Sequence, residues 1–161
     1  MADDRDFLDA AQIGDYHLVD TLLRKGQSAD THDDHGQTAP CLSAMYGHAR
    51  VASRLIEAGA NPNARNEAGA TVLMIAAEFP RPDIVRLLLA SDADVNAVAA
   101  DGRTALLNAI WSADSNSEVV KALVEAGADV HTSDANYGLT PREWAERAGK
   151  REEARLLAGA D

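Results

Sequence analysis

Two short stretches of the sequence hold residue types that could do chemistry, and the first is "HDDH" at residues 32–35. It places two histidines and two aspartates side by side, and these are ligand types that suit zinc and other transition metals. The same residues are common in any polar turn, and no ligands follow at the spacing of a zinc site. We therefore expect a polar turn with no bound metal, and we expect no other cofactor.

The second stretch holds Cys41 and His48, which could pair as a nucleophile and its base. Cys41 falls within a predicted helix near the core, where a free cysteine behaves as a small hydrophobic side chain. The sequence has no phosphate-binding glycine loop and no nucleophile elbow. We predict that the protein is not an enzyme.

The composition narrows the classes of partner. The chain has 161 residues and a net charge of −11, which argues against binding to nucleic acid and suits a basic protein partner or simple solubility. The uncharged stretches are too short to span a bilayer, and the charged start lacks the apolar region of a signal peptide. With a single cysteine, these features predict a cytoplasmic protein in a reducing compartment.

A repeat of 33 residues organises the chain. Gly36, Gly69 and Gly102 are 33 residues apart, and a threonine stands two positions after each of them. Ten of the eleven glycines fall on three recurring positions of this frame, and Gly159 is the exception. Aromatic residues make up only 4% of the chain while alanine and leucine are abundant, which favours closely packed helices.

Each unit predicts two short helices followed by a turn. The threonine is a suitable N-cap for the first helix, and a glycine such as Gly47 ends it. The second helix, for example "DIVRLLLASD", is apolar nearly all round, so neighbouring units must cover it on two sides. The polar remainder predicts a projecting hairpin whose backbone Asn63 and Asn96 hold through their amides.

These units resemble the ankyrin repeat, most closely in "LLLASDADVNA", "ALVEAGADV" and "LIEAGANPNA". The resemblance implies a single domain over residues 1–161, an all-α solenoid of stacked helix-turn-helix units. The repeats lie at about 3–32 (N-terminal cap), 33–65, 66–98, 99–134 and 135–161 (C-terminal cap). No unit keeps the family's histidine in its "TPLH" stretch, which reads "TAPC", "TVLM", "TALL" and "TPRE".

The resemblance also implies a binding surface on the concave side, built from hairpin tips and the exposed side of each first helix. Four of the seven aromatic residues fall on it, and they predict a row of rings across neighbouring repeats. Trp144 is expected to serve packing instead. The residues predicted to bind a partner are Asp34, His35, Gln37, Met45, Tyr46, Glu67, Glu78, Phe79, Asp101, Arg103, Trp111, Ser112, Tyr137 and Arg147.

We therefore predict a monomeric, non-catalytic protein-interaction module that acts as an adaptor, scaffold or inhibitor. The alternative is a small-molecule-binding protein or a regulatory subunit of an enzyme, although an ankyrin array offers no deep closed cavity.

One joint between helices departs from the others. In "AAEFPRPDIV" (76–85), Pro80 stands where other units have a glycine, and proline cannot take the left-handed conformation. We predict that the first helix ends at Ala77, that Asp83 caps the second helix, and that this turn differs in shape. The next joint, "WSADSNSE" (111–118), carries two extra residues, so the two irregular joints are neighbours.

Overall fold

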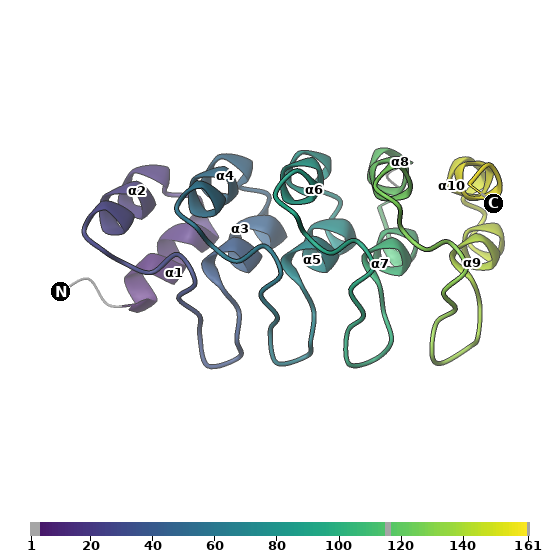
Figure 1. Cartoon of the computed structure of the whole chain (residues 1–161), viewed down its shortest axis with the longest axis horizontal. Coiled ribbons are helices and arrows are strands. Elements are labelled where there is room, and N and C mark those ends of the chain that lie inside the picture. The colour runs from purple at the N-terminus through teal and green to yellow at the C-terminus, as the bar shows by residue number, and fades with distance from the viewer. Residues whose placement is uncertain (1–3, 115–116, 161) are drawn as a thin grey trace.

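A computed structural model describes residues 4–114 and 117–160, and its helices stand in two parallel rows with long loops projecting below them (Figure 1). Part of the irregular joint at 111–118 lies outside the described residues. The inner row contains α1 (Asp4–Ile13), α3 (Ala39–Tyr46), α5 (Val72–Glu78), α7 (Ala105–Trp111) and α9 (Pro141–Arg147). The outer row contains α2 (Tyr16–Arg24), α4 (Ala49–Glu57), α6 (Pro82–Leu89), α8 (Ser117–Glu125) and α10 (Arg151–Ala158).

The predicted all-α solenoid is therefore confirmed, with one helix from each row in every repeat. We number the repeats one to five by these pairs. We call the side formed by the exposed surfaces of the inner helices and by the hairpins the inner face. None of the helices described is long and apolar enough to cross a membrane.

Threonine caps begin four of the inner helices as predicted. The side-chain oxygens of Thr38, Thr71, Thr104 and Thr140 each accept a hydrogen bond from the backbone N–H three residues later. Where the family's histidine is missing, Cys41 Sγ lies 3.3 Å from Thr38 Oγ1, and Glu143 completes a capping box with Thr140.

Glycine conformations follow the repeat frame. The ten glycines on the recurring positions all have positive φ, whereas Gly159 has a φ of −88°. In repeat three the position of Gly59 is taken by Asp92, which has a φ of 60° and is the only non-glycine residue with positive φ in the part of the chain described. At Gly59 and at Asp92 alike, a residue in the left-handed conformation follows the outer helix and ends it.

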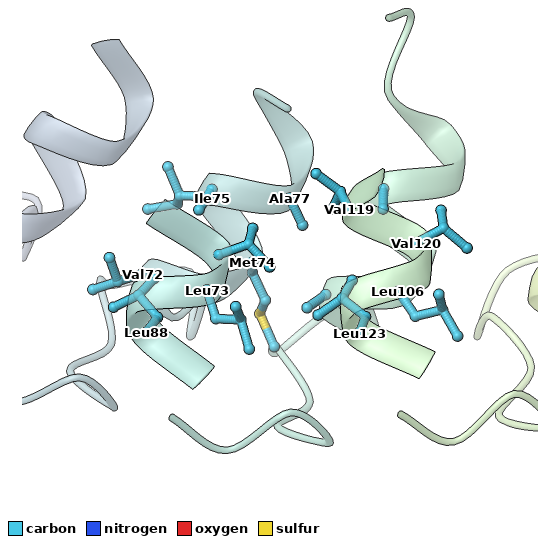
Figure 2. Close-up of a cluster of buried hydrophobic side chains, with 14 of the residues drawn as sticks. Val72, Leu73, Met74, Ile75, Ala77, Leu88, Leu106, Val119, Val120 and Leu123 are labelled. Carbon is cyan, nitrogen blue, oxygen red and sulfur yellow. The ribbon is translucent and has the colours of Figure 1, made fainter. Parts of the chain in front are cut away.

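The core lies between the two rows. Figure 2 shows its centre, where side chains of α5 such as Leu73 and Met74 lie toward the α8 residue Leu123. Leu106 and Val119 belong to the same buried cluster. The inner helices are enclosed most completely, since Val72 to Ala77 of α5 are all buried. Neighbouring repeats cover the outer helices on two sides, as expected, since α6 packs against both α4 and α8. These helices are not apolar all round, because α8 exposes Glu118, Lys121 and Glu125 to solvent.

The Pro80 joint has its own shape, as predicted, but its helix ends differ from the expectation. Helix α5 continues to Glu78, and Phe79 follows with a φ of −103°. Asp83 is not the N-cap of α6, because that helix begins at Pro82, which needs no hydrogen-bond partner at the first helical position. Asp83 instead pairs with Arg86 at 3.1 Å.

Three series of hydrogen bonds connect successive repeats. Asn63 Nδ2 donates to Asp92 O and Asn63 Oδ1 accepts from Asp94 N, and Asn96 makes the same pair of bonds to the repeat that follows it. This confirms the predicted role of both amides. Neighbouring hairpins are also joined, since Glu67 N donates to His35 O and Ala100 N donates to Ala68 O.

In the third series, the donor is the residue that follows the glycine or proline between the two helices of a repeat. His48 Nε2 donates to Gln12 O at 2.9 Å, Arg81 Nη2 to Met45 O at 3.1 Å, and Lys150 Nζ to Ser112 O at 2.6 Å. Each carbonyl lies near the C-terminal end of the preceding inner helix, where unpaired carbonyls and the helix dipole favour a donor. These bonds fix the inner helices relative to one another.

Candidate binding surface

The predicted site residues gather most closely on the inner face of repeats three to five. Two neighbouring cavities open there, one of about 420 Å³ and one of about 500 Å³. Trp111, Ser112 and Ala113 contribute to the walls of both, so the cavities adjoin. Of the predicted residues, those that line one or both cavities are Glu78, Phe79, Arg103, Trp111, Ser112 and Tyr137.

Three aromatic rings form a cluster on the inner face of repeats four and five. Trp144 packs edge-to-face against Trp111, with centroids 5.6 Å apart, and against Tyr137, with centroids 5.5 Å apart. Phe79 lines the smaller cavity beside Trp111 and is 38% exposed. Tyr46 lies nearer the N-terminal end, where its hydroxyl accepts a bond from Gln12 Nε2. Trp144 packs against the core, as expected, and it also connects two predicted site residues and lines the larger cavity.

Other predicted residues are distributed along the same face in smaller groups. His35 Nδ1 and Glu67 Oε2 are 3.9 Å apart on neighbouring hairpins, and both side chains are exposed. Asp101 holds Arg103 at 2.6 Å. Asp34 lines a separate cavity of about 470 Å³ with α1 residues.

The remaining three predicted residues are divided between structural and exposed positions. Gln37 is half-buried beside the turn made by Asp33, and Met45 packs against the core. Arg147 is exposed at the end of α9.

Asp134 organises the wall of the larger cavity, and the sequence patterns did not identify it. Its carboxylate accepts hydrogen bonds from the backbone N–H groups of Asn136, Tyr137 and Leu139 and from Trp144 Nε1. Burial alone would raise the pKa of Asp134, but these four bonds outweigh burial and hold the pKa below its ordinary value. Asp134 thereby fixes the hairpin of repeat five and the Trp144 ring together.

Replacing Asp134 by Asn is expected to lower the melting temperature at pH 7 by about 5 °C, because an amide N–H₂ would face two of the four donors. Since the folded-state pKa is lowered, the carboxylate's contribution is complete above the ordinary aspartate pKa near 4 and is lost as pH falls through the folded value. The difference between wild type and Asp134→Asn should therefore shrink in thermal melts at about pH 2. Asp83→Asn on the outer row is the control, and an Asp134→Asn difference that is equal at both pH values would contradict the assignment.

Lys150 and Asn108 are two further residues that the sequence patterns missed. Lys150 lines the larger cavity, and burial lowers the pKa of its ammonium group. Asn108 is only 3% exposed and lines the smaller cavity. Lys150 could have been found from its frame position, which matches that of His48 and Arg81, whereas no sequence signal distinguishes Asn108.

Cys41 and His48, which could have formed a nucleophile and its base, are each held in the packed structure. Cys41 is fully buried, which raises the pKa of its thiol and disfavours the reactive thiolate. His48 is directed to Gln12 O in repeat one. Within residues 4–114 and 117–160, no group of three or more histidine, cysteine or acidic side chains has an arrangement that could hold a metal ion.

Charge is divided unevenly between the two rows. The five outer helices contain equal numbers of basic and acidic side chains, so they are neutral overall. The net charge of −11 therefore belongs to the inner helices, the hairpins, the connecting turns and the chain ends. A surface with this imbalance attracts cationic groups, and the attraction weakens with salt.

Comparison with known families agrees with the repeat frame. A family model described as ankyrin repeats (3 copies) matches residues 7–99, and a model described as ankyrin repeat matches residues 101–135. A search of curated proteins gave no match.

Proposed function

Because the chain belongs to the ankyrin repeat family, we propose that it is a non-catalytic module that binds a partner protein with a basic surface through its inner, concave face. Ankyrin repeats are generally protein–protein interaction modules and typically lack catalytic activity. The observation that carries the proposal is the pair of adjoining cavities on this face, flanked by exposed rings. Large rings beside a pocket are typical anchors of protein interfaces.

The charge distribution supports the basic partner. The neutral outer helices give no preference, whereas the acidic inner side would speed encounter with a basic surface. The bonds between repeats support a surface formed before binding, which reduces the ordering entropy that binding costs. In this role the protein is an adaptor, or an inhibitor that covers a site on its partner.

Site-specific photo-crosslinking tests this proposal. A photoreactive phenylalanine analogue at Phe79 on the inner face should capture a basic protein from the native cell, and recovery should fall as salt rises. The same analogue at Lys121 on the outer helix α8 is the matched control and should not capture it. Equal capture from both positions, or capture from Lys121 alone, would contradict the proposal.

A small-molecule ligand is the second candidate, and the larger cavity favours it because about 500 Å³ lies within the range of ligand sites. A thermal-shift screen against metabolites separates the two functions, since a specific ligand stabilises the folded state by mass action. A specific rise of several degrees that Trp144→Ala abolishes would favour the second candidate.

A further inference from the structure

The smaller cavity, between α5 and α7, has walls that suit a cationic guest. Glu78 and Asp114 contribute carboxylates to it, and Phe79 and Trp111 contribute rings. Among residues 4–114 and 117–160, neither carboxylate has a basic group within 4 Å, and Asp114 interacts with the Lys150 ammonium group only at longer range. Arg103 is the only basic residue in the described wall, and Asp101 already holds its guanidinium at 2.6 Å. The cavity therefore offers acceptors and ring faces to a positive charge.

Asn108 gives an independent indication that a donor belongs here. Its Nδ2 donates to Met74 O at 3.2 Å, but its buried Oδ1 has no hydrogen-bond partner in the described structure. A buried acceptor without a partner is costly, so such groups are rare in folded proteins. Asn108 lines this cavity, so a donor that reached its Oδ1 from the cavity would satisfy it.

We propose that this cavity receives an arginine side chain of the partner, and that the adjoining larger cavity receives an apolar side chain three residues away on the same extended segment. Arginine matches because its five N–H donors can serve two carboxylates and an amide oxygen while its flat face stacks on rings. This inference rests on the proposed function, because it names the segment that the inner face would hold.

The larger cavity differs in chemistry, which sets the order of the two anchors. Trp111, Trp144 and Tyr137 line it, so an apolar side chain would be buried against rings. Lys150 is the only charged residue in its described wall, and an ammonium group disfavours a second cation. The arginine therefore belongs between repeats three and four, and the apolar side chain between repeats four and five.

The spacing follows from the repeat. Packed helices lie about 8–10 Å apart, and the two cavities occupy successive gaps between inner helices. A polyproline II segment rises about 3.1 Å per residue with three residues per turn, so residues i and i+3 project from one face about 9 Å apart. Such a segment would place its two anchors in the two cavities across the Trp111 ring.

Selection from a displayed library of random dodecapeptides against the intact protein tests this inference. We expect enriched sequences to carry an arginine and an apolar residue three positions apart. A synthetic peptide of the enriched sequence should bind at least about tenfold more weakly when citrulline, a neutral analogue of the same shape, replaces its arginine. In Glu78→Gln/Asp114→Asn the two peptides should bind alike, whereas the control Asp83→Asn/Glu125→Gln on the outer helices should keep the difference.

The inference is overturned if no peptide is enriched, if enriched peptides lack this pattern, or if the citrulline peptide binds as tightly as its parent. These outcomes are distinct from failure of the proposed function. Photo-crosslinking to a basic protein from Phe79 would still succeed if the partner binds by a folded surface rather than by an extended segment.

Discussion

Replacing Tyr46, Phe79 and Trp111 together by alanine is expected to abolish partner binding while the fold survives. Large rings at the centre of an interface contribute about 2–4 kcal/mol each, and their effects are not additive. We expect a combined loss of about 4 kcal/mol, which is roughly a thousandfold in affinity. Tyr46 and Phe79 are 49% and 38% exposed, so their removal leaves the core intact. Trp111 is half-buried, and a modest fall in melting temperature should accompany its loss.

The measurement is the recovery of the partner that the wild-type protein captures, followed by titration once that partner is purified. Circular dichroism should report unchanged helix content in the triple variant. Tyr16→Ala supplies a matched control, because Tyr16 is an aromatic residue of the outer helix α2 that packs beneath Arg50. If the triple variant recovers the same partners as wild type, the assignment of the inner face is wrong.

Most of the fold was predictable because its determinants are local and repeat along the chain. A threonine accepts a bond from an N–H three residues later, and a glycine takes a left-handed conformation, whatever the rest of the molecule does. Thr71 and Gly47 therefore behave as the sequence predicted. The wrong prediction that Asp83 caps α6 also has a local cause, because α6 begins one residue earlier, at Pro82.

The candidate site was less predictable because its geometry depends on contacts between repeats. Family positions identified Phe79 and Trp111, which line one cavity, but they separated Trp144 from the ring cluster it joins. Asp134 was missed because its role depends on an indole ten residues away and on a hairpin with one residue more than the others. Asn108 was missed because an unpaired acceptor becomes evident only when its surroundings are known.

Replacing Gly47 by alanine is expected to destabilise the array by about 2–3 kcal/mol, through two separable effects. Gly47 ends α3 with a φ of 81°, and alanine in left-handed backbone costs roughly 1–2 kcal/mol. A Cβ atom there would also lie 2.8 Å from Arg81 Cζ, so the guanidinium must move and its bond to Met45 O would be lost.

Gly59→Ala isolates the first effect, because Gly59 has a φ of 92° and no atom within 4 Å of an added Cβ. Urea unfolding should show a larger loss of free energy for Gly47→Ala than for Gly59→Ala, and the excess measures the contact between repeats two and three. In Gly47→Ala/Arg81→Ala the clash is absent, so the added effect of the glycine change should fall to that of Gly59→Ala. Equal losses for the two single glycine variants would show that Arg81 moves aside freely, and the bond to Met45 O would then contribute nothing to the stacking of the repeats.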